Sequence, residues 1–382
     1  MINNVSLKNF KSYKEERFKL SMLSVFCGNN SVGKSTAIQA ISIPLQSNFS
    51  ETASLNGGLT EVGFINDIHH KNPKGEDLKI ELTIGDDVYS WGYEDYSEHL
   101  KLSNNEINSL DKDRRVNTKD IREILDNFQY LQAERYGPRD NYDLAKSSMY
   151  HSKWLGSKGE FTAEFLSNVE NFQRFFVGGE FVADGGELDH RLHSSKKNQV
   201  LHDHINAWMS EISPGIEVSN RVFKEASVAV STYSQNSFNS LKPHNVGFGV
   251  SYVLGIVTAL LLTKPGGLVI IENPEAHLHP RGQSYLGRLI ALTALAGVQV
   301  IVETHSDHLL NGIRVITRLN EHFDPKLFTL YYISQGDQQS NVEKITIAKD
   351  GKLSNWPDGF FDQQAQDMFM IMTGKSKLPG QE

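Results

Sequence analysis

A glycine-rich segment near the N-terminus constrains the fold more than any other part of the chain. Residues 28–35 read Gly-Asn-Asn-Ser-Val-Gly-Lys-Ser, a complete G-x-x-x-x-G-K-[ST] motif. It lies between a short apolar run, residues 23–27, and a helix-like stretch, residues 36–41, which is the strand–loop–helix context of a phosphate-binding loop. Glycines let backbone N–H groups approach phosphate oxygens, Lys34 can reach the β- and γ-phosphates, and Ser35 can place its hydroxyl on Mg²⁺. The motif therefore predicts a nucleoside triphosphate site. Its phosphate-binding residues are expected to be Asn29, Asn30, Ser31, Val32, Gly33, Lys34, Ser35 and Thr36.

Composition argues against several classes of protein. The formal net charge of −8 disfavours a surface dominated by nucleic-acid binding, although it leaves room for a local basic groove. The single cysteine, Cys27, cannot form an internal disulfide and suits a reducing compartment, so we expect a cytoplasmic protein. We expect no secretory leader, because the N-terminus shows an alternating strand pattern. The most apolar stretch, residues 250–263, is shorter than the roughly 18–20 residues that cross a bilayer, which predicts a core helix and no membrane association.

The hydrophobic pattern has two regular ends, both of α/β character. Near the N-terminus, residues 5–10 and 77–84 alternate between apolar and polar side chains, and the second run turns through Gly-Asp-Asp into another strand, which predicts a β-hairpin. Further on, residues 268–271 are continuously apolar, as in a strand buried on both faces of a parallel sheet, and residues 298–302, Val-Gln-Val-Ile-Val, predict the next buried strand. A helix-like stretch from Pro280 to Ala296 joins them and completes a βαβ unit.

The middle of the chain is less regular and rich in Asn, Asp, Ser and Lys. It shows neither sustained heptads nor an internal repeat, so we do not expect a long coiled coil. Helix-like patterns occur at residues 118–128, 159–176 and 198–212. Beyond the βαβ unit, the sequence predicts two strands and a last amphipathic helix at residues 331–333, 342–347 and 363–373.

An acidic residue follows the first apolar strand of the βαβ unit. Glu272 stands at the carboxyl end of residues 268–271, where ligands of open α/β sheets bind. A P-loop protein becomes an ATPase when such a strand delivers an acid to Mg²⁺. The next residues, 273–280, read Asn-Pro-Glu-Ala-His-Leu-His-Pro and are dense in polar groups. A solvated loop with a helix cap is the alternative interpretation.

With these motifs the chain resembles the ABC-type ATPase heads of the SMC, RecF and OLD-nuclease group. That group has an acid–acid–Pro–Glu segment, seen here at residues 272–275, followed by Leu-His-Pro at residues 278–280. Residues 7–13, Leu-Lys-Asn-Phe-Lys-Ser-Tyr, look like the group's opening strand, and Glu-Thr-His-Ser at residues 303–306 looks like its switch-histidine strand. Together with Trp-Pro-Asp-Gly-Phe-Phe at residues 356–361, these segments resemble a prokaryotic subfamily, several relatives of which occur in anti-phage systems. The resemblance implies ATP and Mg²⁺ as ligands.

The fold that the resemblance implies is an α/β, P-loop ABC-type ATPase head, a mixed sheet flanked by helices. We expect an antiparallel β portion at its N-terminus and a mainly helical insertion in the middle. The expected divisions are residues 1–100 and 244–350 for the two parts of the head, 101–243 for the insertion and 351–382 for a tail with a helix.

The family's functional residues carry over with one departure. Glu272 matches the acid that holds Mg²⁺. The following position usually holds the glutamate that polarises the attacking water, but here it is Asn273, whose amide cannot take a proton. Glu275 is the obvious substitute, and His305 would orient the γ-phosphate or the water. Either Glu275 is the base, or the protein is a slow ATPase used as a switch.

Related heads hydrolyse ATP as dimers, in which a signature loop of one subunit completes the site of the other. Residues 247–251 occupy the corresponding place, so Gly249 and Ser251 are expected to contact nucleotide; a glycine-rich helix start without a ligand is the alternative. By the same resemblance, Lys11 is expected to contact nucleotide and residues 57–67 to form a loop that senses Mg²⁺.

Other clusters admit less specific interpretations. Four histidines could bind a metal by residue type, but their spacing does not match a zinc site. Switch or packing roles are therefore favoured for His277, His279, His305 and His308. Arg135 and Arg139 lie beside a turn and could contact phosphate, a partner or a surface acid. The chain after His305 is short for a nuclease domain and has no Asp-x-Asp pair, so we do not expect a nuclease.

The sequence thus favours an ATP-binding and hydrolysing head that dimerises on ATP, as a homodimer or higher homo-oligomer, and regulates a partner effector such as a nuclease or toxin. A DNA-binding repair or chromosome-maintenance head and a non-hydrolysing scaffold that holds ATP are the alternatives. We expect Lys34→Ala to abolish nucleotide binding or turnover at little cost to the core. A bulky residue at Gly249 is expected to block association but spare ATP binding by the monomer.

Overall fold

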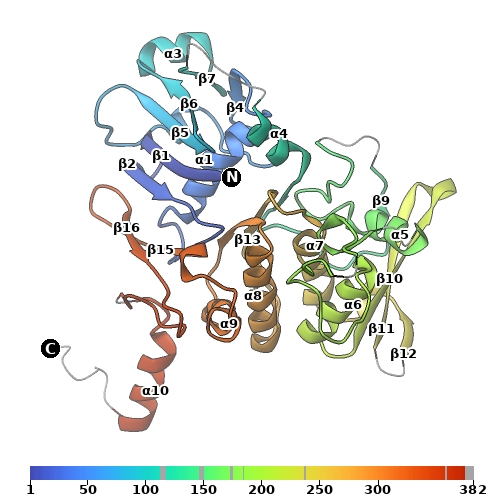
Figure 1. Ribbon diagram of the computed structural model, residues 1–382. Helices are drawn as coiled ribbons and strands as arrows, with labels where there is room; N and C mark the ends of the chain where they lie inside the picture. Colours follow the sequence, from blue (N-terminus) through green and yellow to red (C-terminus); the bar gives the residue numbers. More distant parts are fainter. Residues whose placement is uncertain are drawn as a thin grey trace.

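Three β-sheets organise the chain in the computed structural model (Figure 1). The structure describes residues 1–111, 118–145, 150–172, 175–183, 185–235, 238–357 and 359–374. The N-terminal sheet is antiparallel, in the order β2-β1-β5-β6-β7-β4. Its strands are β1 (Ile2–Phe10), β2 (Tyr13–Lys19), β4 (Thr52–Ser54), β5 (Leu78–Ile84), β6 (Asp87–Tyr93) and β7 (Glu106–Ser109). The predicted hairpin is therefore confirmed as β5 and β6.

The main sheet is mixed and has the order β16-β15-β3-β14-β13-β8. Its strands are β3 (Leu23–Gly28), β8 (Phe128–Leu131), β13 (Leu268–Glu272), β14 (Gln299–Glu303), β15 (Phe328–Ser334) and β16 (Asn341–Ile345). All neighbours pair in parallel except β15 and β16, which pair antiparallel. The predicted βαβ unit is present as β13, α8 (Pro280–Leu295) and β14. However, β14 lies between β13 and the P-loop strand β3, an order that the sequence pattern did not reveal.

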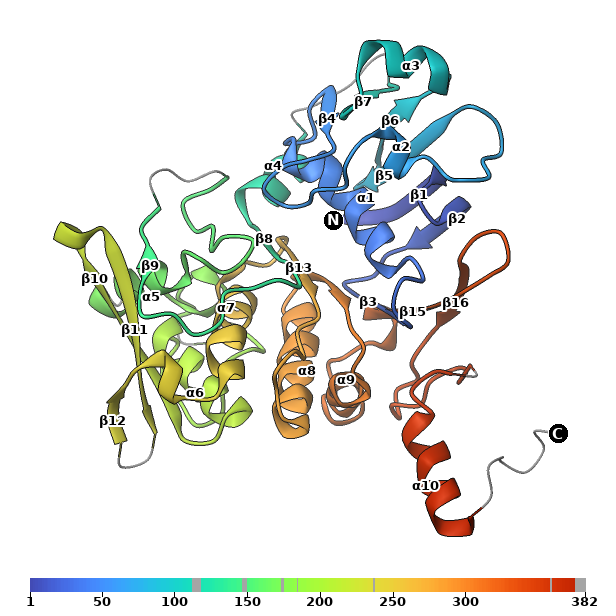
Figure 2. The same cartoon turned by 180° about the vertical axis from the view of Figure 1, so that it is seen from behind.

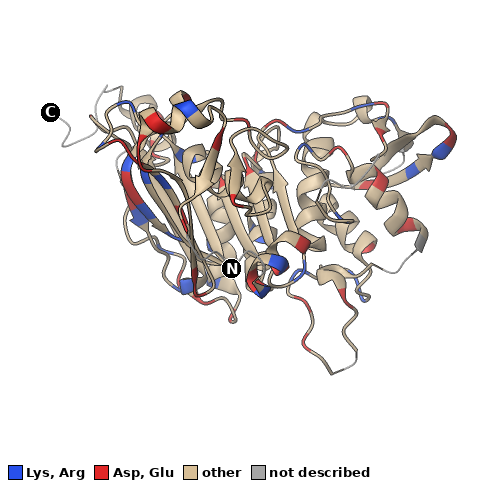
Figure 3. Cartoon of the chain, turned by 90° about the horizontal axis from the view of Figure 1, so that it is seen from above, with Lys and Arg blue, Asp and Glu red and all other residues tan. Residues whose placement is uncertain are grey.

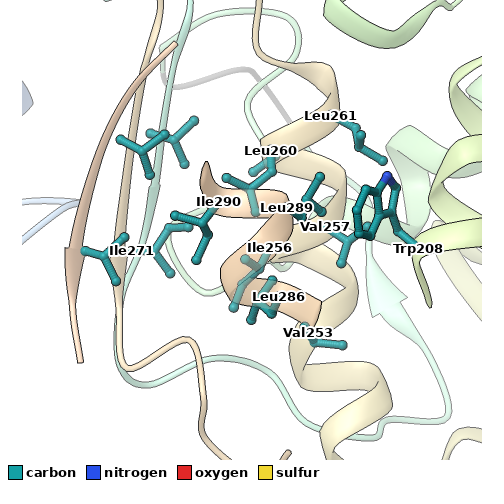
Figure 4. Packing of buried hydrophobic residues seen from close by; sticks show 14 of the residues in the cluster. Trp208, Val253, Ile256, Val257, Leu260, Leu261, Ile271, Leu286, Leu289 and Ile290 are labelled. Carbon is teal, nitrogen blue, oxygen red and sulfur yellow. The ribbon is translucent and has the colours of Figure 1, made fainter. Parts of the chain in front are cut away.

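The two faces of the main sheet are covered differently. On one face lie α1 (Lys34–Gln46) and the N-terminal sheet, which share one apolar core with side chains such as Phe26 and Ile270. On the other face lie α6 (Leu201–Ile212), α7 (Phe248–Leu262), α8 and α9 (Asp307–Leu319). Figures 1 and 2 show α7, α8 and α9 side by side beneath the sheet, and Figure 4 shows α7 and α8 packing between Trp208 and Ile271. Helix α7 is apolar around its whole circumference, as expected for a helix buried in the core.

The middle of the chain contains the three predicted helices and also strands that were not predicted. The helices are α4 (Lys119–Asp126), α5 (Thr162–Phe172) and α6. Four strands form a separate antiparallel sheet, β9 (Tyr142–Asp143), β10 (Ile216–Phe223), β11 (Val228–Gln235) and β12 (Phe238–Leu241). In addition, β8 belongs to the main sheet and β7 to the N-terminal sheet, so strands of the head extend into the region assigned to the insertion.

The strands of this middle sheet escaped prediction because their residues are mostly small and polar. Residues 216–221 of β10 alternate between buried and exposed, but the buried Asn220 is itself polar, and the last residue, Phe223, is an exposed aromatic. The outer edge of β10 is closed by side chains of neighbouring helices. Asn206 accepts a hydrogen bond from Val218 N at 2.7 Å, and Glu170 accepts one from Asn220 N at 2.8 Å. This edge is thus capped against pairing with another chain.

The chain ends in α10 (Gln363–Thr373), at the predicted position. Figure 2 shows this helix projecting away from the body, and each of its residues is partly or fully exposed. The remaining helices are the short α2 (Ile65–Ile68) and α3 (Tyr96–Leu102). Over the described ranges, no helix is long and apolar enough to cross a membrane.

Candidate nucleotide site

The five parallel strands of the main sheet, β15, β3, β14, β13 and β8, end at one edge. The register pairs Glu303, the last residue of β14, with Phe26 of β3 on one side and with Glu272, the last residue of β13, on the other. Side chains alternate between the two faces of a strand, and Ile270 and Ile301, two residues earlier, pack in the core on the α1 side. Both carboxylates therefore face α1, which begins at Lys34.

The loop between β3 and α1 has the backbone that phosphate binding requires. Gly28 and Gly33 have φ values of 138° and 102°, and a Cβ at Gly28 would lie 2.0 Å from the carbonyl oxygen of Ile333 on β15. A residue with a side chain does not fit there. Lys34 is 3% exposed, and its Nζ donates a hydrogen bond to the carbonyl of Asn29 at 2.5 Å. Burial lowers the pKa of Lys34, opposed by the nearby Glu303.

The buried position of Lys34 corrects one expectation drawn from the sequence. We expected its removal to cost the core little, but the side chain is packed and hydrogen-bonded before any ligand binds. A variant at this position needs a stability measurement beside any binding measurement.

Glu303 is a site residue that the sequence analysis missed. The hydroxyl of Ser35 lies 2.8 and 3.1 Å from its two carboxylate oxygens, and Lys34 Nζ lies 4.0 Å from Oε1. Burial raises the pKa of Glu303 to about 7; Glu272 and Glu275 act in the same direction, and Ser35 and Lys34 oppose them. The signal was present in the sequence, because Glu303 ends an apolar strand just as Glu272 does.

Glu272 is held from the side of β8. The hydroxyl of Tyr130 donates a hydrogen bond to Oε1 at 2.5 Å, and the backbone N–H of Ala133 donates to Oε2 at 3.1 Å. Tyr130 sits on β8 and Ala133 just beyond it, so the strand that the sequence analysis did not detect supplies both contacts.

Arg135 holds the backbone around Glu272 in place by hydrogen bonds. Its guanidinium donates hydrogen bonds to the carbonyls of Gln132 and Glu272, both at 2.5 Å, and of Asn273, at 2.7 Å. It also lies 4.4 Å from the ring centre of Tyr252 on α7. Burial lowers the pKa of Arg135 to about 10. The residue is 6% exposed, which excludes the surface ion-pair role weighed in the sequence analysis.

Asn273 adopts a left-handed backbone conformation with φ 45°, which is uncommon for a residue other than glycine. Its N–H donates to the carbonyl of Glu303 at 2.8 Å. Its side-chain Oδ1 is buried and has no hydrogen-bond partner among the described residues. Such unsatisfied, strained positions cluster at functional sites.

Glu275 joins the segments that follow β13 and β14. Its Oε2 accepts a hydrogen bond from the hydroxyl of Thr304 at 2.8 Å, and its Oε1 accepts one from the backbone N–H of His305 at 2.7 Å. His305 itself is exposed at the site edge. Its pKa is lowered, first by partial burial and then by Lys34, with Glu275 and the backbone of Gly28 opposing. The structure thus brings Glu275, His305 and Lys34 into one electrostatic neighbourhood.

The segment expected to act as a signature loop opens helix α7. Gly247 and Phe248 are exposed, and the ring centre of Phe248 lies 4.5 Å from that of His277, with the two rings tilted by 54°. Gly249 is buried, and a Cβ there would lie 2.3 Å from the carbonyl oxygen of His277. The hydroxyl of Ser251 lies 3.1 Å from that of Tyr233 in the same chain. A bulky residue at Gly249 would therefore displace the loop after β13, so the variant we expected to spare ATP binding is not a clean probe of association.

Lys11 and the end of the 57–67 loop, Asn66 and Asp67, line a cavity of about 490 Å³ beside the P-loop. Lys11, Ser31 and Asp67 are among its lining residues. Lys11 Nζ donates a hydrogen bond to Gln39 Oε1 at 2.8 Å, and burial lowers the pKa of Lys11. In the 57–67 loop, the carbonyl of Leu59 accepts a hydrogen bond from Gln132 Nε2 at 2.7 Å, which links this loop to the end of β8.

The remaining histidines and Arg139 have local contacts. His279 caps α8, since Nδ1 accepts from Arg281 N at 3.3 Å, and His308 lies 3.8 Å from Asp307. Arg139 is exposed and lies over the ring of Tyr136. Within the described ranges, no group of three or more His, Cys, Asp or Glu residues is arranged to hold a metal ion by itself.

Comparison with known proteins agrees with this geometry. A family model described as "AAA domain, putative AbiEii toxin, Type IV TA system" matches residues 23–311, and a model for a family of proteins of unknown function matches residues 324–371. None of the curated proteins matches the sequence.

Two solved heads share the fold. A Smc head domain from Pyrococcus furiosus with an extended coiled coil, bound to the C-terminal domain of ScpA, is 12% identical with a TM-score of 0.52. The match covers 97% of this chain and 99% of that chain. A SmcHead bound to the C-winged helix domain of ScpA is 15% identical with a TM-score of 0.51, over 91% of this chain and 98% of that one. The protein therefore belongs to the AbiEii-type AAA-domain family, and it is a P-loop ATPase of the ABC type with the fold of an SMC head.

Proposed function

We propose that this protein binds and hydrolyses MgATP, dimerises when ATP is bound, and passes that state to a partner effector. The observation that carries the proposal is the edge of the main sheet. There Lys34 and Ser35, at the start of α1, meet Glu272 and Glu303, at the ends of β13 and β14. Glu275, in the loop after β13, lies beside them. ATP binding follows from the family. The roles of individual residues and the partner are the proposed part.

The phosphates would lie on the loop of residues 29–36, with Lys34 as the cation. Mg²⁺ fits the donors, because the Ser35 hydroxyl and the Glu272 carboxylate are hard oxygen ligands on the α1 side of the sheet. When bound, the ion would neutralise charge on the β- and γ-phosphates. Lys34 would exchange its contact with the Asn29 carbonyl for a phosphate oxygen.

We assign Glu275 and His305 to the attacking water. Glu275 is the first acid after Asn273, and it holds the backbone of His305. Both of its oxygens already accept hydrogen bonds, from the Thr304 hydroxyl and the His305 backbone, so a water would have to share an oxygen that already has a donor. The two interpretations drawn from the sequence thereby combine: Glu275 acts as the base, and turnover is slow enough for the bound state to serve as a signal.

We propose that the exposed start of α7, at Gly247 and Phe248, contacts the nucleotide of a second copy. A residue in the P-loop and a residue at α7 of the same chain would then belong to two different composite sites. Tyr252 and Arg135 connect α7 to the backbone carbonyl of Glu272. Contact between α7 and the nucleotide of a second copy would therefore affect the position of Glu272.

The partner is proposed to be an effector protein, a toxin or nuclease of anti-phage defence. This step rests on the family description, which refers to toxin–antitoxin systems, and on the two similar heads solved with ScpA domains. Co-purification with the product of the adjacent gene, with and without ATP, would test it. A partner that binds equally well to wild type and to a variant unable to bind ATP would contradict nucleotide control.

The contacts of the N-terminal sheet favour this function over DNA binding. Several of its cations are paired with acids, as in Lys8–Asp77 at 2.7 Å and Lys79–Glu81 at 2.6 Å. Figure 3 shows positive and negative residues interspersed over the strands at this end of the molecule. DNA binding that weakens steeply with salt would revive the alternative.

The nucleotide assignment is tested with Lys34→Ala. We expect loss of MgATP binding by titration calorimetry, with thermal unfolding measured in parallel because Lys34 is buried. A folded variant with unchanged ATP affinity and turnover would refute the assignment.

The role of Glu275 is tested with Glu275→Gln, which should keep ATP binding and lose roughly 10²–10⁴-fold in turnover. Complete absence of turnover in the wild type, with partner and DNA supplied, would favour the scaffold.

Association is tested by light scattering with and without MgATP. We expect a nucleotide-dependent increase in mass that Phe248→Asp abolishes while MgATP still binds the monomer. Leu319→Asp is the matched control, since Leu319 is an exposed apolar residue at the far end of α9. A mass that never responds to nucleotide would exclude the shared site.

A further inference from the structure

The hydroxyl expected to meet Mg²⁺ is paired with an acid other than the expected one. Ser35 Oγ lies 2.8 Å from Glu303 Oε2 and 3.1 Å from Oε1. The carboxylate of Glu272, which the resemblance assigns to the metal, accepts its hydrogen bonds from Tyr130 and Ala133 on the β8 side. The two acids are direct partners across β13 and β14, so they share one face of the sheet but have different neighbours.

Strand order explains why Glu303 is the nearer acid. Because β14 lies between β13 and β3, its last residue pairs with Phe26, two residues before the P-loop begins. Glu303 therefore stands beside the start of α1, while Glu272 stands one strand further out. Lys34 Nζ, 4.0 Å from Glu303, is the nearest cation and would turn to phosphate when nucleotide binds.

The burial of Glu303 is costly unless it serves the site. The residue is 6% exposed, and a buried carboxylate needs a cation or several donors. Its partners are one hydroxyl and one lysine, and the proposed function assigns both to MgATP. Once Lys34 contacts phosphate, a divalent cation bound at Ser35 can compensate the charge of Glu303.

We propose that Glu303 is a metal-site acid that holds Mg²⁺ together with Ser35, and that Glu272 supports it from the next strand. The proposal rests on the proposed function and adds to it the residue on which the metal depends most. It also supplies an acid to a site in which Asn273 leaves one position without a carboxylate.

The experiment measures nucleotide binding, so it does not require turnover. A non-hydrolysable fluorescent ATP analogue is titrated in EDTA and in increasing Mg²⁺, with wild type, Glu303→Gln and Glu272→Gln. Glutamine has the same size as glutamate and retains an oxygen that can accept from Ser35, but it lacks the charge. Binding of Mn²⁺ in the presence of the analogue, followed by electron paramagnetic resonance, reports the metal directly.

We expect Glu303→Gln to lose tenfold or more of the gain in analogue affinity that Mg²⁺ confers, with little change in EDTA, and to lose the bound Mn²⁺ signal. Glu272→Gln should lose a smaller part of the affinity gain that Mg²⁺ confers. A Glu303→Gln variant with the wild-type Mg²⁺ dependence, or with equal loss in EDTA and in Mg²⁺, would overturn the proposal. Glu303→Asp, which keeps the charge, should recover part of the Mg²⁺ effect and provides the test if the glutamine variant does not fold.

The outcome is separable from that of the proposed function. If wild type binds the analogue and Lys34→Ala does not, the nucleotide site stands whatever Glu303 does. If wild type fails to bind the analogue at all, the proposed function fails first.

Discussion

Helix α7 has a buried arginine at each end, and the two are held in opposite ways. At the carboxyl end, Arg191 is fully buried and donates to both oxygens of Asp189 and to the carbonyls of Leu260 and Thr263. Although burial alone would raise the pKa of Asp189, Arg191 holds it below its usual range. A cation also suits the carboxyl end of a helix, where backbone carbonyls lack partners.

At the amino end, Arg135 makes hydrogen bonds to three backbone carbonyls and stacks on Tyr252. Its Nε has no partner among the described residues, and the helix dipole places positive charge at the same end. The comparison shows that an arginine paired with an acid anchors the helix at its carboxyl end, whereas at its amino end the guanidinium is held by backbone carbonyls of the segment that carries Glu272. We therefore expect substitutions at the two ends to separate stability from function.

Arg191→Ala should produce the largest loss of stability. It leaves Asp189 buried without its cation and the carbonyls of Leu260 and Thr263 unpaired, which should cost about 3–5 kcal/mol in the free energy of unfolding. Urea denaturation measures it. The folded fraction should keep its MgATP affinity. Replacing both charges, with Asp189→Leu and Arg191→Met together, should cost less than Arg191→Ala, and an equal or larger cost would contradict the pairing argument.

Arg135→Lys should mainly affect turnover. Lysine keeps the charge but cannot reach three carbonyls with a planar fork, so Glu272 and Asn273 would lose their fixed backbone. We expect about 10–100-fold slower single-turnover hydrolysis, the usual scale for residues that orient a ligand, with a smaller loss of stability than at Arg191. If Arg135→Lys instead left turnover unchanged and greatly reduced stability, Arg135 would have the same purely structural role as Arg191.

Gly249→Ala should disturb the site through packing. Its new methyl group would collide with the carbonyl of His277, and overpacking of this kind typically costs about 1–3 kcal/mol. Gly247→Ala is the matched control, because a methyl group there meets open space among the described residues. Equal melting temperatures for the two variants would show that the loop after β13 can shift to accommodate the methyl group at no cost in stability.

Tyr252→Phe should have the smallest effect, because it removes one hydroxyl. That hydroxyl donates to the carbonyl of Ala133, whose N–H in turn holds Glu272. We expect about 1 kcal/mol of destabilisation and a few-fold slower turnover. Tyr233→Phe, which removes the hydroxyl beside Ser251, should leave turnover unchanged. If both variants slow turnover equally, Tyr252 has no special link to the acid.

Features set by local sequence were predictable from the chain. The P-loop, the hairpin of β5 and β6, and the βαβ unit of β13, α8 and β14 each depend on contiguous residues, and all are present. Helix α10 occupies the predicted range for the same reason. These elements have strong periodicity and recognisable ends.

Features set by distant pairing were not predictable. Strand β8 has four residues and acquires its identity from β13, far along the chain. The roles of Arg135 and Tyr130 follow from that pairing, and so they were missed. Glu303 was placed in the segment that resembles the switch-histidine strand and was given no role of its own, because its approach to Ser35 depends on β14 lying next to β3.

The position of β3 has a consequence for how the protein is made. Both neighbours of this apolar strand, β14 and β15, are translated long after it, whereas β1, β2, β5 and β6 can pair early. At about 5–20 residues per second, β3 waits roughly 15–60 seconds on the ribosome with both hydrogen-bonding edges open. The strand that carries the nucleotide loop therefore stays unpaired for most of synthesis, and the first sheet can fold well before an ATP site exists.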